Sequence, residues 1–156
     1  MADHQTFTQE ALMRLALEQA SLAAGEGEVP VGAVVARAGE VIAVGRNRRE
    51  SGKNALYHAE IEAIDGACKR LGGWRLPGCE LFVTLEPCPM CAGAIINSRI
   101  VRVIFGAYDH KAGSFGSLVN LNDFPYNHKP EILGGFLEAE CAALLSDFFS
   151  NLRKNK

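Results

Sequence analysis

Apolar side chains recur every three or four positions over residues 8–24, which is the period of an amphipathic helix. Thr8 is a residue type that caps helix N-termini, and Gly25 just past the end is a residue type that stops helices. Two short runs rich in β-branched residues follow, and the Ala-Gly pair between them is typical of a hairpin turn. We therefore expect hairpin strands at residues 31–36 and 41–44 around a turn at Ala38-Gly39.

The rest of the chain alternates between helical and extended patterns. A polar loop over residues 107–130 is longer than the dozen or so residues usual for a connection, which indicates that the loop has a function. The order of elements predicts an α/β sheet covered by helices. The expected helices are 59–71, 88–97 and 138–152, and the expected strands are 81–85, 101–105 and 132–133.

Composition narrows the class of protein. The chain has 156 residues, of which 48% are hydrophobic and 22% are charged, so we expect one folded domain over residues 1–156 rather than disorder. No apolar stretch approaches the roughly 18 residues of a membrane-spanning helix. Residues 1–5 lack the basic start and apolar core of a signal peptide. Five unevenly spaced cysteines indicate reduced thiols, so we expect a cytoplasmic protein without a membrane contact.

Two short segments contain the candidate chemistry, His58-Ala59-Glu60 and Glu86-Pro87-Cys88-Pro89-Met90-Cys91. Cys88 and Cys91 are three positions apart, so both sulfur atoms lie on one face of a helical first turn. Two thiolates and one imidazole are suitable zinc ligands, and no fourth ligand is evident. Zinc with three protein ligands keeps a water molecule, which is the arrangement of a catalytic site.

Glu60 is two positions from His58 and cannot easily share the same metal. We expect it to take a proton from the zinc water and to pass it on. Helix N-termini at both segments would favour thiolates and hydroxide. A structural zinc or a redox pair remains the alternative for CxxC alone, but a structural zinc needs a fourth ligand.

The other cysteines and histidines do not offer that ligand. Cys68, Cys79 and Cys141 are expected in the core, because free cysteine behaves as a small hydrophobe. The remaining histidines fall in the N-terminal tail or in the long loop, where they are expected at the surface. These histidines are His4, His110 and His128.

HxE followed by PCxxC is the signature of zinc-dependent deaminases. From about residue 7 to residue 152 the chain resembles bacterial tRNA-specific adenosine deaminases, members of the cytidine and deoxycytidylate deaminase superfamily. The zinc motif alone also fits deaminases of cytosine, cytidine, guanine or dCMP. The long loop, Ala92-Gly93-Ala94 and Asn97-Ser98-Arg99-Ile100 favour the tRNA family. The other matching segments are 29–34, 45–47, 84–91, 105–109, 111–113, 127–128 and 140–149.

The resemblance implies a cytidine-deaminase-like three-layer α/β/α sandwich with a mixed five-stranded sheet, and a homodimer with active sites near the interface. It implies hydrolytic deamination of adenosine to inosine at the wobble position of a tRNA anticodon stem-loop. By the same resemblance Asn47 contacts the target base, and Asp109 and Lys111 match loop positions near the substrate strand. Lys111 fits a solvated surface equally well. The implied zinc ligands are His58, Cys88 and Cys91, with Glu60 as proton shuttle.

One segment departs from the family pattern. The residues before the HAE motif are Asn54-Ala55-Leu56-Tyr57 in place of a Pro-Thr-Ala-like sequence. Tyr57 either reshapes the mouth of the base pocket or packs beneath the helix. Deamination of a free base or nucleoside, such as guanine or cytosine, therefore stays as the alternative function. A non-catalytic binding module stabilised by zinc is disfavoured, because a structural zinc site does not require Glu60.

Charge distinguishes between these functions, because a free base offers no phosphates. The net charge is −2, so any contact with nucleic acid must be local. Residues 46–53 hold four basic side chains against Glu50, a local charge of +3, and the C-terminal tail is also basic. Each basic cluster either binds phosphates or is a solvated surface. The Phe148-Phe149 pair either stacks on a flanking base or packs in the core. The basic side chains are Arg46, Arg48, Arg49 and Lys53, with Arg153, Lys154 and Lys156 in the tail.

Overall fold

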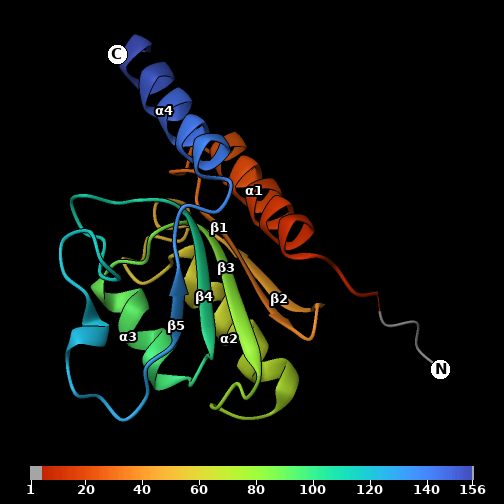
Figure 1. Cartoon of the computed structure of the whole chain (residues 1–156). Helices are drawn as coiled ribbons and strands as arrows, with labels where there is room; N and C mark the ends of the chain where they lie inside the picture. The colour runs from red at the N-terminus through yellow and green to blue at the C-terminus, as the bar shows by residue number, and fades with distance from the viewer. Residues whose placement is uncertain (1–4, 156) are drawn as a thin grey trace.

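A computed structural model describes residues 5–155 and contains one mixed five-stranded sheet in the order β2-β1-β3-β4-β5 (Figure 1). β1 pairs antiparallel with β2 and β3, whereas β3, β4 and β5 are parallel neighbours. The expected mixed sheet is confirmed. The strands are β1 (Gly32–Arg37), β2 (Glu40–Arg46), β3 (Cys79–Leu85), β4 (Arg102–Ala107) and β5 (Glu131–Leu133).

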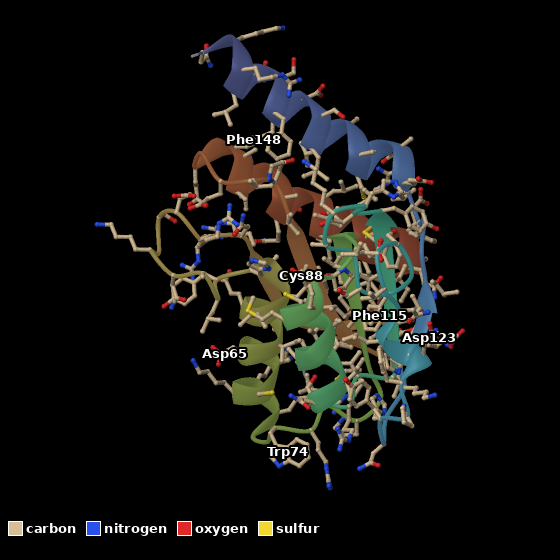
Figure 2. All side chains as sticks on the ribbon, turned by 90° about the vertical axis from the view of Figure 1, so that its left-hand side faces the viewer. Asp65, Trp74, Cys88, Phe115, Asp123 and Phe148 are labelled. Atoms are coloured by element: carbon tan, nitrogen blue, oxygen red, sulfur yellow. The ribbon has the colours of Figure 1, made fainter. Side chains whose placement is uncertain are left out.

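Helices cover both faces of this sheet, which confirms the three-layer arrangement. Because side chains alternate along a strand, Val34, Phe82 and Ile104 pack toward one pair of helices, whereas the neighbouring residues pack toward the other pair. The first pair is α1 (Gln9–Gly25) and α4 (Glu138–Lys154), and the second pair is α2 (Ala59–Leu71) and α3 (Pro89–Asn97). In Figure 2, Phe148 of α4 lies at one end of the molecule and Trp74, just after α2, at the other.

The predicted ends of the elements are confirmed at several points. The Thr8 hydroxyl accepts a hydrogen bond from Ala11 N at 3.1 Å, as expected of an N-cap. Ala38 and Gly39 both have positive φ, 51° and 78°, which is the geometry of a tight hairpin turn. Gly25 does not stop α1, because it is still helical and the chain turns only at Gly27, where φ is 81°. That prediction is wrong.

The start of α3 also differs from the prediction. The helix begins at Pro89, and Cys88 is its N-cap residue with extended backbone. Proline suits the first helical position because it has no N–H that would need a partner there. Cys88 is therefore held at the junction between β3 and α3, with its sulfur hydrogen-bonded to Cys91 in the first turn of α3.

The long loop between β4 and β5 has structure of its own. It contains a short 3-10 helix, η1 (Leu121–Asp123), and a β-bridge between Phe115 and Asn120. Ser114 and Phe115 are buried, so the first part of the loop packs into the body of the molecule. No helix of the described chain has the length and apolarity needed to cross a membrane.

Gly45 allows β2 to lie directly under the first turn of α2, because a Cβ there would overlap Ala59 O. Gly45→Ala is expected to push α2 off the sheet and to lower the free energy of unfolding by about 1–3 kcal/mol. For a protein of this size each kcal/mol lowers Tm by roughly 2–4 °C. Calorimetry of Gly45→Ala tests the close approach of β2 and α2. Gly25→Ala is the control, because a Cβ at Gly25 would meet nothing within 4 Å. Equal Tm values for the two variants would contradict the close approach.

Candidate active site

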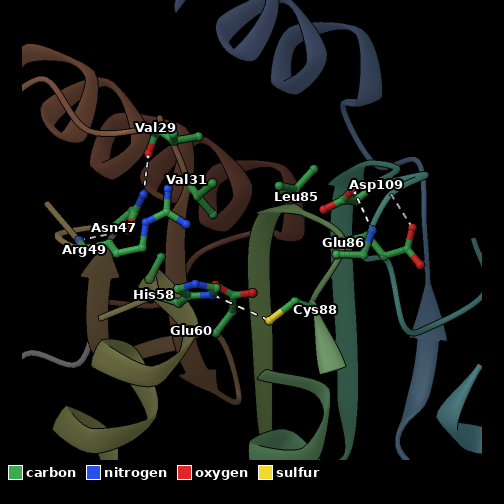
Figure 3. Close-up of a pocket in the computed structure, with 12 residues that line it drawn as sticks. Val29, Val31, Asn47, Arg49, His58, Glu60, Leu85, Glu86, Cys88 and Asp109 are labelled. Carbon is green, nitrogen blue, oxygen red and sulfur yellow. Dashed lines mark hydrogen bonds between the residues drawn. The ribbon is translucent and has the colours of Figure 1, made fainter. Parts of the chain in front are cut away.

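A pocket of about 230 Å³ opens where the ends of β3 and β4 meet the N-termini of α2 and α3 (Figure 3). Clefts at the carboxyl ends of neighbouring strands are the usual ligand sites of α/β sheets. The pocket brings together the residues that the sequence predicts for the site from four separate segments. Its lining consists of Val29, Val31, Asn47, Arg49, His58, Ala59, Glu60, Leu85, Glu86, Cys88, Asp109 and Ala112.

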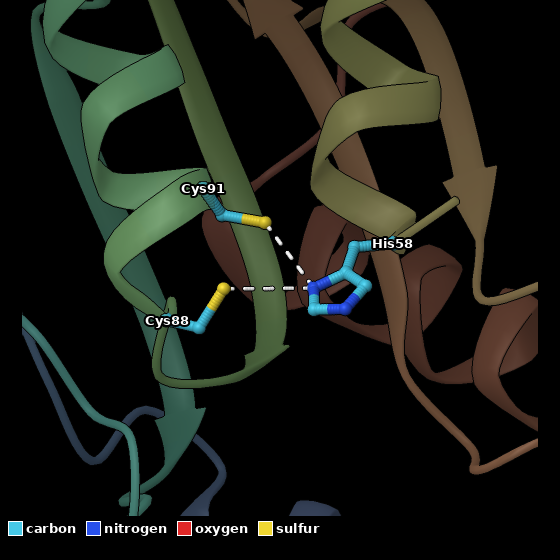
Figure 4. A group of neighbouring side chains, drawn as sticks. All are labelled: His58, Cys88 and Cys91. Atoms are coloured by element: carbon cyan, nitrogen blue, oxygen red, sulfur yellow. Dashed lines mark hydrogen bonds between the residues drawn. The ribbon is translucent and has the colours of Figure 1, made fainter. Parts of the chain in front are cut away.

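The predicted metal ligands converge at one wall of this pocket. His58 and Cys88 are the N-cap residues of α2 and α3, and Cys91 lies in the first turn of α3. The His58 Nδ1 atom is 3.6 Å from Cys88 Sγ and 3.5 Å from Cys91 Sγ (Figure 4). Within residues 5–155, these three residues are the whole of the group that could hold a metal ion.

The spacing of the three donor atoms fits a tetrahedral metal. Zn–S bonds of about 2.3 Å and Zn–N bonds of about 2.0–2.1 Å at a tetrahedral angle place nitrogen and sulfur about 3.5–3.6 Å apart. The two distances in the structure match this separation. Cys79 and Cys141 are buried and Cys68 is partly buried, all outside the group, so the core prediction is confirmed for Cys79 and Cys141.

The two thiols of the group influence each other's protonation. A hydrogen bond from Cys91, together with one from His58, lowers the pKa of Cys88 to about 4. The pKa of Cys91 is raised, because the shared hydrogen bond with Cys88, burial and the nearby Glu60 all oppose a second negative charge. The hydrogen bond to Cys88 in turn raises the pKa of His58. A divalent cation among the three atoms would stabilise both sulfurs as thiolates.

Glu60 lies in the first turn of α2 and is 4% exposed. Burial raises the pKa of its carboxyl to about 7. The carboxyl lines the pocket but is not a member of the metal-binding group, as the sequence predicts. A carboxyl with this pKa can both accept and donate a proton near neutral pH.

Asn47 and Asp109, the predicted substrate contacts, lie in the same pocket. The Asn47 amide donates to Val29 O at 3.2 Å and accepts from Arg49 N at 3.2 Å. Asp109 Oδ1 accepts from Lys111 N and Ala112 N, so this carboxylate also fixes the start of its own loop. The Lys111 side chain is exposed and does not line the pocket.

Comparison with known proteins relates this geometry to an enzyme family. The model of the MafB19-like deaminase family matches residues 7–153. The chain is 51% identical over 148 residues to a tRNA-specific adenosine deaminase of Bacillus subtilis (strain 168), covering 94% of this chain and 92% of that protein. A tRNA-specific adenosine deaminase of Aquifex aeolicus (strain VF5) is 46% identical over 147 residues, with 94% and 97% covered.

The chain belongs to the family of tRNA-specific adenosine deaminases.

Solved structures agree with this family. One of them, from a study of A-to-I editing by tRNA:A34 deaminases at the wobble position, is 42% identical with a TM-score of 0.81 and covers 88% of this chain and 100% of that chain. A guanine deaminase from Nitrosomonas europaea is 26% identical with a TM-score of 0.78, covering 94% and 87%. The fold is therefore shared with a guanine deaminase, and the higher identity distinguishes the tRNA-specific family.

The sequence predictions give no role to two buried carboxylates beside the pocket, Glu86 and Glu28. Glu86, 2% exposed, accepts from the backbone N–H groups of Asp109, Phe115 and Ser117 and from the Ser117 hydroxyl, so it anchors the long loop to the end of β3. The available signal is a charged residue between Leu85 and Pro87, at the end of an apolar strand.

Glu28 has the same role on the opposite side of the pocket. It is 1% exposed and accepts from the backbone N–H groups of Glu50 and Ser51, which fixes the loop that follows Asn47. Burial opposes the charge of Glu28, but these two donors outweigh it and lower the pKa of the carboxyl. In this deaminase both walls of the pocket are thus held by buried carboxylates.

Two of the four basic side chains of residues 46–53 are paired with carboxylates from outside that segment. Arg46 forms an ion pair of 2.7 Å with Glu26, and Arg48 one of 2.9 Å with Glu62. These carboxylates come from α1's C-terminal end and from α2, so only the fold brings them to the arginines. Arg49 lines the pocket, and Lys53 is exposed.

Tyr57 does neither of the two things expected of it. It does not line the pocket, and its ring lies against Gly52 of the preceding loop with 42% of its surface exposed. A change at Tyr57 therefore acts on the loop rather than on the pocket.

The other histidines and the C-terminal aromatic pair differ in how far they are exposed. His110 is exposed as expected, whereas His128 is partly buried and its Nε2 lies 2.7 Å from Ile100 O. Phe148 and Phe149 form an edge-to-face pair with ring centroids 5.4 Å apart, and Phe149 is 40% exposed. Arg153 and Lys154 are exposed at the end of α4, while His4 and Lys156 lie outside the described residues.

Proposed function

We propose that this protein deaminates adenosine to inosine at the wobble position of tRNA by hydrolysis. One observation supports this above all others: the chain is 51% identical to a tRNA-specific adenosine deaminase over 92% of that protein's length. The arrangement of the pocket is consistent with it, because a three-donor group and a buried carboxyl lie side by side at its wall.

His58, Cys88 and Cys91 would hold a zinc ion, whose expected donor spacing the group matches. When bound, zinc lowers the pKa of a coordinated water to about 7 and so supplies a nucleophile at neutral pH. His58 and Cys88 line the pocket, so the ion would lie at the wall that the target base would approach.

Glu60 would move the protons of the reaction. Its carboxylate accepts a proton from the attacking water as the C6–O bond forms, and delivers a proton to N1 of the adenine ring. Glu60 then takes the remaining proton of the added C6 hydroxyl and delivers it to the departing amine as the C6–N bond breaks and the C6 carbonyl forms, so that water and adenosine give inosine and ammonia. One carboxyl suffices because the proton arrives, moves and leaves in sequence. The pKa of about 7 suits both directions of transfer.

Asn47 and Asp109 would contact the substrate from opposite walls of the pocket. The pocket volume of about 230 Å³ is below the roughly 300–1,000 Å³ of sites for drug-sized ligands. It has room for one base, which must leave the stack to enter, and an unpaired anticodon loop allows this at little cost.

Deamination of a free base is the second candidate, favoured by the likeness to the guanine deaminase of Nitrosomonas europaea. Incubation with an adenosine-34 anticodon stem-loop and, separately, with guanine, cytosine, adenosine and cytidine distinguishes the two. We expect inosine and ammonia from the stem-loop at least 100-fold faster than ammonia from any free base or nucleoside. Deamination of guanine or cytosine in the absence of stem-loop activity would establish the alternative.

We further propose that residues 1–156 form one deaminase domain, that the protein is a homodimer and that it acts in the cytoplasm. The match of the family model to residues 7–153 supports the single domain. The resemblance to tRNA-specific adenosine deaminases supports the homodimer. Five free cysteines support a reducing compartment. A monomer mass in analytical ultracentrifugation would contradict the dimer.

A further inference from the structure

Arg49 differs from its two neighbouring arginines in what its side chain faces. Arg46 and Arg48 are bound to carboxylates at 2.7 and 2.9 Å. Within the described part of the chain, Arg49 has an ion pair only with Glu50, at 4.0 Å, and the Glu50 side chain is 76% exposed. An exposed pair of that length contributes little, so the guanidinium of Arg49 is the one of the three whose charge is left available.

The backbone of Arg49 is nevertheless held firmly. Its N–H donates to Asn47 Oδ1 at 3.2 Å, and its carbonyl accepts from Asn54 N at 3.1 Å. Glu28 fixes the next two residues through their N–H groups. Figure 3 shows the Arg49 side chain reaching from this loop toward Val31 and His58 at the pocket.

We propose that Arg49 binds a phosphate of the RNA backbone next to the target adenosine, and so makes the pocket selective for a polynucleotide over a free base. This inference rests on the proposed function. Because the pocket has room for one base, the ribose and its phosphates stay at the mouth. Arg49 is the basic side chain in the pocket lining, and a guanidinium is a geometric match for a phosphate.

The neighbouring negative charges give a competing explanation, in which Arg49 only balances the charge of the site. Glu28, Glu60 and Glu86 are buried around the pocket, and Glu28 is close enough to Arg49 for their charges to interact. A balancing role would change stability or metal content when Arg49 is replaced, but it would not change how RNA affinity depends on salt.

Arg49→Gln and Arg48→Gln form a matched pair, because each removes one charge from adjacent positions. Binding of a fluorescent anticodon stem-loop is measured between 50 and 200 mM salt, apart from any turnover. We expect Arg49→Gln to weaken binding roughly tenfold at low salt, as loss of a charge-assisted hydrogen bond does. It should also flatten the slope of log K against log salt by about 0.7, the value for one phosphate contact on a single strand.

A stem-loop with an uncharged methylphosphonate on either side of the target adenosine identifies the phosphate. The methylphosphonate should weaken binding to the wild-type protein and to Arg48→Gln, and at one of the two positions it should have no further effect on Arg49→Gln. Arg49→Lys should recover the salt slope and part of the affinity. Lysine restores the positive charge but cannot donate the two parallel hydrogen bonds of a guanidinium.

Equal salt slopes for the wild type and Arg49→Gln, or additive effects of Arg49→Gln and both methylphosphonates, would overturn the assignment. Lower Tm or metal content in Arg49→Gln with an unchanged slope would show the balancing role instead. Because binding is scored without turnover, a wild-type protein that binds the stem-loop but does not deaminate it refutes the proposed function while the salt slopes still decide Arg49.

Discussion

Glu60→Gln is expected to lower deamination of the anticodon stem-loop by at least the 10²–10⁴-fold typical of general acid–base catalysis, with fold and metal intact. Glutamine has the size of glutamate but cannot take the proton from water or deliver one to the base. The site gives the physical reason, since Glu60 is buried in the pocket wall and outside the metal-binding group. Single-turnover kinetics at saturating enzyme measures the effect on the chemical step.

Glu62→Gln is the matched control, because it makes the same change two residues later in α2, at a side chain that does not line the pocket. It should lose the ion pair with Arg48 while keeping the rate of the chemical step within a few-fold. Turnover by Glu60→Gln close to the wild-type rate, or loss of its metal, would show that Glu60 is not the proton carrier.

Cys88→Ala is expected to remove the metal and with it all detectable deamination. Two donors from His58 and Cys91 would remain, and loss of one of three protein ligands leaves too few to fill a zinc site. We expect one zinc per chain in the wild-type protein by elemental analysis, and a thiolate-to-cobalt absorption band after exchange. Both should be absent from the variant.

Cys68→Ala provides the control, because Cys68 is a partly buried free thiol outside the group. It should keep one zinc per chain and the cobalt spectrum. Full retention of zinc by Cys88→Ala, or a spectrum that requires four protein ligands, would contradict the three-donor site.

The parts of the site that could be predicted from sequence are those in which neighbouring residues act together. His58 and Glu60 are two positions apart, and Cys88 and Cys91 three, so their placement follows from two helix starts. The topology that brings the two starts together follows from the resemblance to a known family. The predicted helix over 59–71 also matches α2, which ends at Gly72 with φ of 78°.

Contacts between distant segments could not be predicted. The ion pair that neutralises Arg46 joins it to a residue 20 positions away, and Glu86 holds a loop 23 to 31 positions away. A local charge count includes none of these partners, so the charge of +3 counted for residues 46–53 exceeds the charge that is left unpaired there. A glycine in the sequence does not by itself mark the end of a helix. Gly25 has no positive φ and remains in α1.

Mapping inosine along a whole tRNA after incubation with the purified protein tests whether the protein is a wobble-position adenosine deaminase. Sequencing of complementary DNA reports inosine as guanosine at each position. The account predicts conversion at the first anticodon position, no conversion at any other adenosine, and none at all with Glu60→Gln. Absence of inosine at that position, together with ammonia release from guanine or cytosine, would contradict it.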